Sequence, residues 1–117
     1  MHTTNLIIRQ TQVNLPFRMF MDGIYNDFIV KNRINPEIGL DAVALDTFTK
    51  SDYIKAGDFF AETGSRITVH GPFMDLSAGS QDPDIRKVTE KRFSQLVEAA
   101  EILRPVHVVC HAGYESR

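Results

Sequence analysis

Ile67-Thr68-Val69-His70-Gly71-Pro72 is a short β-branched run that ends in a histidine and is then broken by a glycine–proline pair. A similar run, Val106-His107-Val108-Val109-Cys110-His111, follows after one long helical pattern. A strand, a helix and a second strand at this spacing form a βαβ unit, whose two strands are parallel and usually adjacent. The sequence therefore predicts an α/β fold in which His70 and His111 lie at the ends of neighbouring parallel strands.

The carboxyl ends of these strands are the expected place for a functional site. Parallel α/β folds build their sites at that end of the sheet. The loop over residues 71–82 is also long for a strand-to-helix connection, which usually has ~2–6 residues. Long loops at this end of a strand commonly carry function, so we expect the site to include this loop.

Composition narrows the class of protein. The chain has 117 residues, a net charge of −2 and 43% hydrophobic residues, which is typical of one globular domain over residues 1–117. Lysine and arginine are spread along the chain, which argues against a nucleic-acid partner. No apolar run is long enough to cross a membrane, and no signal peptide is recognisable. With one cysteine, Cys110, the chain is expected to be cytoplasmic, with a buried and reduced thiol.

The remaining pattern predicts further strand and helix units. Strands are expected over residues 6–15, 39–45, 66–70 and 106–111, and helices over 17–32, 51–63 and 83–104. The last helix has the strongest signals, because Asp82-Pro83 supplies an N-cap and a first-turn proline. These four strands and three helices form parallel (β/α) units, about half of a TIM barrel, which needs ~250 residues. Each strand ends in a polar residue: Asn14, Asp46, His70 or His111.

Several motifs carry a family resemblance. They are residues 13–16, 35–42 and 70–77, then Asp82-Pro83 with Ile85-Arg86, Thr89 and Arg92-Phe93, and finally residues 108–114. Together they resemble sugar phosphate isomerase/epimerase proteins, which belong to the xylose-isomerase-like TIM barrel superfamily that also includes the type IV AP endonucleases. The resemblance spans nearly the whole chain and implies the N-terminal half of such a barrel.

The resemblance also implies a reaction class, metal-assisted proton transfer on a sugar or sugar phosphate. Family enzymes hold a divalent metal (Zn, Mn or Mg) mainly with residues of the second half of the barrel, so we expect little or no turnover from these 117 residues. His70 and His111 match positions that resemble metal ligands in the endonuclease branch. In the sugar-handling branches the same region contacts substrate, and both roles remain open.

The residues themselves support both roles for the two histidines. Two imidazole nitrogens about 3.3 Å apart can share one tetrahedral zinc at ~2.0–2.1 Å each. Histidine also suits proton transfer near neutral pH, so His70 and His111 are candidate catalytic residues. Asp46 or Glu115 would supply a further ligand, and with Asn14 they are the candidate substrate-binding residues. The alternative is that each histidine is a hydrogen-bonded structural residue, and that Asn14 only serves the turn before Pro16.

Two other functions remain open. A non-catalytic half-barrel could act as an assembly or binding module, and an AP-endonuclease-like metal nuclease is the weaker alternative because no basic groove is evident.

A sheet of four parallel strands has two open edges, which invite pairing with another chain. We therefore expect a homo-oligomer or a complex with a complementary half-barrel, since Ile67, Val69, Val106 and Val108 would otherwise face solvent.

Overall fold

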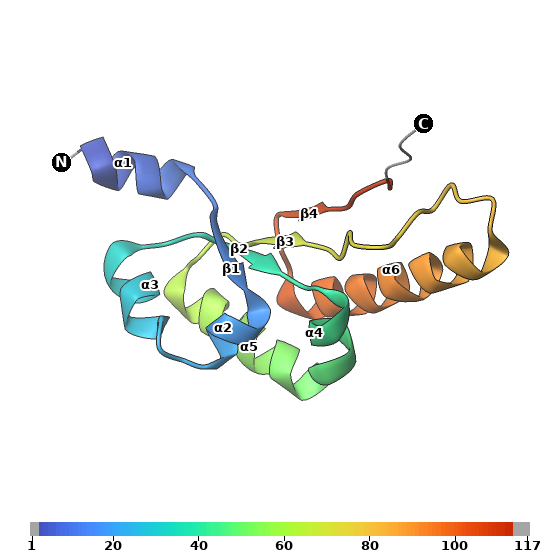
Figure 1. Ribbon diagram of the computed structural model, residues 1–117. Helices are drawn as coiled ribbons and strands as arrows, with labels where there is room; N and C mark the ends of the chain where they lie inside the picture. Colours follow the sequence, from blue (N-terminus) through green and yellow to red (C-terminus); the bar gives the residue numbers. More distant parts are fainter. Residues whose placement is uncertain (1–2, 114–117) are drawn as a thin grey trace.

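The computed structural model describes residues 3–113 and contains a four-stranded parallel sheet (Figure 1). The strands lie in the order β1-β2-β3-β4, so each strand is hydrogen-bonded to the strand that precedes it and to the strand that follows it along the chain. Their bounds are β1 Val13–Pro16, β2 Pro36–Gly39, β3 Thr68–His70 and β4 His107–Val109. Parallel strands joined by helices confirm the predicted α/β class, which corresponds to half of a TIM-barrel-like domain.

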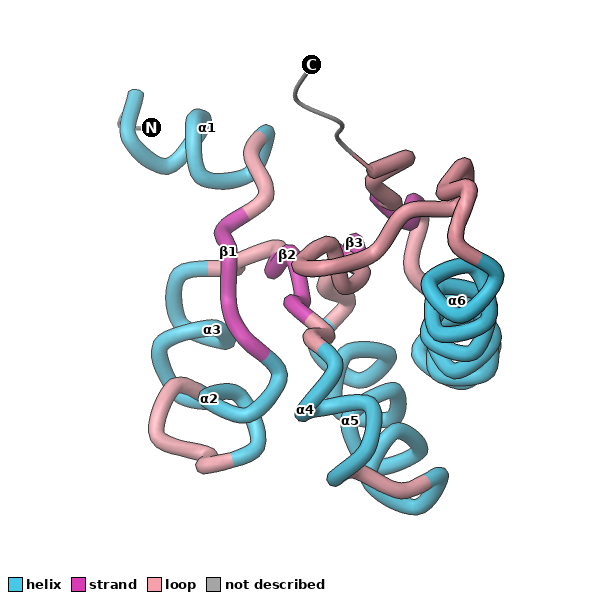
Figure 2. The backbone as a smooth tube through the Cα atoms, turned by 45° about the vertical axis from the view of Figure 1, so that its right-hand side comes forward, coloured by secondary structure: helices cyan, strands magenta, loops and turns pink. Residues whose placement is uncertain are grey.

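Helices fill all three connections between the strands. Their bounds are α1 Thr3–Gln10, α2 Phe17–Met21, α3 Asn26–Asn32, α4 Ala42–Thr47, α5 Lys50–Thr63 and α6 Pro83–Leu103. The helices α2 to α6 lie on one side of the sheet, whereas α1 stands apart at the start of β1 (Figure 2). Within residues 3–113, no helix is long and apolar enough to cross a membrane.

The two predicted N-terminal strands were misplaced. The first was expected over residues 6–15, but residues 6–10 belong to α1 and the strand is Val13–Pro16. The second was expected over residues 39–45, but the strand is Pro36–Gly39 and α4 follows it. The Asp41 carboxylate accepts a hydrogen bond from the Ala44 amide at 2.7 Å, and this N-cap starts a helix where a strand had been predicted.

The helix predicted over residues 17–32 is two helices. Gly23 has a φ of 80°, a left-handed conformation that glycine adopts readily and that interrupts a helix. Its amide donates to the Phe20 carbonyl oxygen at 3.0 Å and so closes α2. The chain then restarts as α3, so that both Phe20 and Ile29 can reach the core.

The later helices lie within one residue of the predicted ranges, but α5 begins at Lys50 with Thr49 as its N-cap, one residue before the predicted start at Ser51. Thr49 and Asp52 form a capping box at the start of α5, and Gly64 ends that helix with a φ of 73°. The Asp82 carboxylate accepts from the Asp84 amide at 2.9 Å, with Pro83 in the first turn of α6. Local capping therefore defines these two helices.

The two faces of the sheet differ in character. Leu15, Ile38, Val69 and Val108 share one register row, and the first three pack against the helices. The next row, which points to the opposite face because side chains alternate along a strand, is polar. It consists of Asn14, Glu37, Thr68 and His107. The sheet is therefore apolar towards the helices and polar on the face that α2 to α6 do not cover.

The expectation that four apolar side chains would face solvent was half wrong. Ile67 and Val69 are buried, at 3% and 0% exposure, because the helices cover them. Val106 and Val108 are 44% and 41% exposed, since they lie at the edge formed by β4. Of these four side chains, only the two at the β4 edge of the sheet are left in contact with solvent.

Candidate functional site

The two histidines meet at the carboxyl ends of β3 and β4. Their Nε2 atoms are 2.9 Å apart, and their ring centroids are 4.9 Å apart. His70 is the last residue of β3, and His111 follows β4 by two residues. The parallel pairing of Thr68–His70 with residues 107–109 brings the two imidazoles to the same end of the sheet.

Phe73 completes the side-chain cluster. Its ring lies edge-on to His70, with centroids 5.5 Å apart, and tilted against His111 at 5.0 Å. The backbone between them is tightly held, because the Gly71 amide donates to the Val109 carbonyl oxygen at 2.9 Å. A Cβ at Gly71 would lie 2.5 Å from a Leu96 methyl group, so any larger residue there would require the Leu96 side chain to shift.

The loop over residues 71–82 is anchored on both sides. The Ser77 amide donates to the Thr89 hydroxyl of α6 at 3.0 Å, and that hydroxyl donates to the Ile85 carbonyl oxygen at 2.8 Å. On the other side, a Cβ at Gly113 would lie 2.9 Å from the Ser77 Cα. The loop therefore has little space to shift relative to His70 and His111.

A pocket of about 340 Å³ opens beside His70. Its lining is Asn14, Pro16, Glu37, Gly39, Leu40, Asp41, Ala42, His70, Gly71, Pro72, Phe73 and Met74. The Asn14 amide donates to the Glu37 carboxylate at 3.2 Å across β1 and β2. Among the described residues, the charged groups of this lining are carboxylates, with no lysine or arginine. The pocket thus combines hydrogen-bonding groups, an aromatic wall and negative charge.

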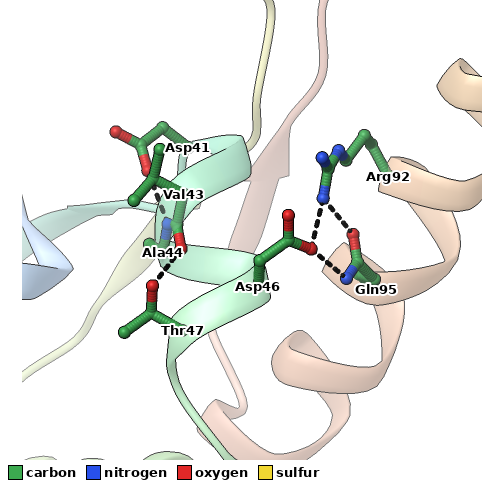
Figure 3. A network of polar contacts seen from close by, with 7 residues as sticks. All are labelled: Asp41, Val43, Ala44, Asp46, Thr47, Arg92 and Gln95. Carbon is green, nitrogen blue, oxygen red and sulfur yellow. Dashed lines mark hydrogen bonds and ion pairs between the residues drawn. The ribbon is translucent and has the colours of Figure 1, made fainter.

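Asp46 lies outside this site, which corrects its predicted place at a strand end. It belongs to α4, where its carboxylate accepts from Arg92 at 2.6 Å and from Gln95 at 3.0 Å, both on α6 (Figure 3). These hydrogen bonds, the Arg92 bond first, lower the pKa of Asp46 to about 2. The carboxylate links two helices and does not line the pocket.

Two other expectations have different outcomes. Glu115 lies outside the described residues, so its predicted role is unchanged. Cys110 was predicted to be buried, but it is exposed. The reason is that β4 is an edge strand whose three residues are all exposed, so neither of its faces is fully covered.

The histidine pair presents two nitrogen atoms of the kind that bind zinc. Both Nε2 atoms are suitable zinc ligands, and their 2.9 Å separation is somewhat shorter than the about 3.3 Å of two ligands on tetrahedral zinc. In residues 3–113, no group of three or more His, Cys, Asp and Glu side chains is arranged to hold a metal ion. The described residues therefore fit two ligands of a metal, and a third would have to come from elsewhere.

Sequence reasoning missed Glu37 and Phe73. Glu37 lies in β2, directly opposite Asn14 in the register, but the strand had been placed after it. The available signal was the polar row itself, because a strand at Pro36–Gly39 puts Glu37 and Asn14 on one face. Phe73 follows the first histidine by three residues, within the motif that was singled out.

The parallel half-barrel is similar in fold to parts of two solved structures. No protein-family profile and no curated protein matches this chain significantly. The TTHB071 protein from Thermus thermophilus, in a structure described as soaked with ZnCl2, has a TM-score of 0.74 and 21% sequence identity, over 89% of this chain and 40% of that chain. A D-tagatose 3-epimerase-like protein has a TM-score of 0.62 and 20% identity, over 89% of this chain and 39% of that one.

At these identities the likeness shows the fold alone. The chain spans about 40% of the length of each of these neighbours. The fold is therefore that of one part of a longer TIM-barrel-like protein.

Proposed function

We propose that this chain forms part of a sugar isomerase or epimerase site, in which His70 and His111 act at the reacting end of a bound sugar. The observation that carries the proposal is the 2.9 Å contact between the Nε2 atoms of His111 and of His70, the second of which lines the pocket. Two imidazoles at the carboxyl ends of parallel strands lie where barrels of this fold place their chemistry. The resemblance of residues 70–77 and 108–114 to sugar phosphate isomerases and epimerases supports the same function.

The reaction class is proton transfer on a carbon next to a sugar carbonyl. A base removes the proton, and the proton returns to the same carbon or to its neighbour, so atoms balance without an oxidant. Histidine is suited to this transfer near neutral pH. If the two imidazoles instead held a divalent metal through their Nε2 atoms, they would no longer serve as the base: the metal would supply Lewis-acid polarisation of the carbonyl oxygen, and another group would move the proton.

The pocket favours an uncharged sugar over a phosphorylated one. Asn14 and Glu37 offer an amide and a carboxylate to sugar hydroxyls, and Phe73 provides an apolar wall. Glu37 and Asp41 would repel a phosphate, and the described lining has no cation to offset that repulsion. A sugar phosphate would therefore need a cation from a bound metal or from residues outside the pocket.

Metal binding tests the role of the histidine pair. We expect Zn²⁺ titrated calorimetrically into the full chain to bind in the wild type, and His70→Ala or His111→Ala to weaken it by at least ~10-fold. The matched control is His107→Ala, which removes an exposed histidine outside the pair and should leave the affinity unchanged. An equal loss in all three variants, or no loss in the first two, would argue against this proposal.

A non-catalytic half-barrel is the second candidate. It is favoured by the finding that residues 3–113 supply no third metal ligand to the histidine pair. The two functions are separated by whether the chain binds a free sugar such as a ketohexose. Chemical-shift changes at Asn14, Glu37 and His70 on addition of the sugar are expected for the first function, and their absence for a half-barrel that serves only in assembly.

A further inference from the structure

The ring of Phe73 touches both histidines as well as the pocket. Its centroid lies 5.5 Å from that of His70 and 5.0 Å from that of His111, and the two imidazole centroids are 4.9 Å apart. Each of the three rings is therefore in contact with the other two. A wall for a sugar requires only the face of Phe73 that lines the pocket, and His111 is not part of that lining. The contact between Phe73 and His111 thus has no part in the wall.

The hydrogen bond between the histidines fixes a distance but not the orientation of either ring. A single contact between two Nε2 atoms leaves each imidazole free to turn about its Cβ–Cγ bond. The planes of the two imidazoles are 55° apart, so the rings do not hold each other by stacking. A third ring that touches both of them restricts these rotations. Phe73 does so, at 89° to the plane of His70 and at 39° to that of His111.

The backbone that carries Phe73 is held on both sides of the residue. Before it, Gly71 is buried, and its amide donates to the Val109 carbonyl oxygen at 2.9 Å. After it, the Ser77 amide donates to the Thr89 hydroxyl of α6 at 3.0 Å. The end of β3 and the helix α6 therefore determine where the Phe73 ring lies, and the histidines pack against a ring whose backbone is already fixed.

We propose that Phe73 is a positioning residue, whose ring holds the imidazoles of His70 and His111 in the orientation in which their Nε2 atoms meet. Phe73 is 50% exposed and does not belong to the hydrophobic core. Its contacts therefore stabilise the arrangement of the site more than the fold. The geometric role concerns this chain alone, and only its consequence for zinc binding rests on the proposed function.

NMR of the full chain tests the geometric role without a metal or a sugar. We expect nuclear Overhauser effects between the ring protons of His70 and His111 in the wild type. They should be lost in Phe73→Leu, which keeps an apolar side chain but no flat ring, and retained in Phe73→Tyr, which keeps the ring. The matched control is Phe28→Leu, because Phe28 is 56% exposed on α3 and does not line the pocket. Circular dichroism verifies folding, and Phe73→Met replaces Phe73→Leu if that variant does not fold.

Zinc affinity provides a second measurement. Phe73→Leu should bind Zn²⁺ about 10-fold more weakly than the wild type, as is usual when a group that orients a metal-bound histidine is lost. Phe73→Tyr and Phe28→Leu should bind it as the wild type does. Histidine contacts that are missing in the wild type, that persist in Phe73→Leu, or that are lost equally in Phe28→Leu would overturn the inference. A wild type that shows these contacts, loses them in Phe73→Leu and has no affinity for zinc would support the role of Phe73 and count against the proposed function.

Discussion

At the scale of single residues, the site depends on how closely neighbouring groups are held. His70 and His111 touch because their strands are adjacent, and Phe73 packs on both rings. Gly113 lies so close to Ser77 that a Cβ at position 113 would crowd the Ser77 Cα. Gly113 and Asp46 each make close contacts that a single substitution can change.

Gly113→Ala should displace the loop beside the histidines. Gly113 has a φ of 95°, and a Cβ there would lie 2.9 Å from the Ser77 Cα, so alanine is both strained and crowded. We expect a loss of about 1–2 kcal/mol in the free energy of unfolding and changed NMR shifts for His70. The control is Gly79→Ala, where a Cβ meets nothing within 4 Å. Equal effects of the two substitutions would show that the crowding at Gly113 has no consequence.

Asp46→Asn should change the pH dependence of stability. The pKa of Asp46 is lowered from 3.8 to about 2 in the folded chain, chiefly by the hydrogen bond from Arg92. Because the pKa of Asp46 is lower in the folded chain than in the unfolded chain, its ionised carboxylate stabilises the fold above about pH 4. This stabilisation is lost as the pH falls towards about 2. Unfolding of wild type and variant should therefore differ at pH 6 and converge near pH 2. A difference that stays constant over this range would contradict the assignment.

At the scale of elements, capping decides where the long helices begin. The α6 N-cap, Asp82, accepts from the Asp84 amide, and Thr89 inside the same helix binds the loop after β3 at Ser77. The start of α6 therefore positions that loop as well as the helix. Loss of the cap should therefore affect both the helix α6 and the loop after β3.

Asp82→Ala should destabilise the chain by about 1 kcal/mol, the usual value of an N-cap carboxylate. Urea unfolding measures the change, and Asp82→Asn serves as the control because asparagine caps as well as aspartate. If both variants lose the same stability, the carboxylate acts through its charge and not through the cap.

At the scale of the whole molecule, residues 3–113 provide four strands of a fold that normally closes with eight. The described residues give the histidine pair no third metal ligand. We therefore expect the purified 117-residue chain to show little or no exchange of sugar C–H hydrogens with deuterated solvent, measured by NMR with added Zn²⁺ or Mn²⁺. Sustained exchange that His70→Ala and His111→Ala abolish would show that the site is complete.

The sequence by itself determined the elements whose signals are local. The α5 and α6 helices begin at capping residues that interact within a few positions, and the βαβ unit around α6 follows from spacing alone. Because such a unit makes its strands parallel neighbours, the placement of His70 and His111 at one sheet end was predictable too. The same reasoning could have identified Phe73 as a site residue, because it follows His70 by three residues within the same motif.

Only the tertiary structure decided where the short N-terminal strands lie. Each has four residues, and in such short segments the pairing partner, not the local pattern, selects which residues form the ladder. Because Asp41 caps a helix, residues 42–47 form α4 and not part of the expected second strand. Asp46 therefore lies on a helix, where its carboxylate accepts a hydrogen bond from Arg92. The same shift put Glu37 beside Asn14 in the pocket, because a strand's register determines which side chains share a face.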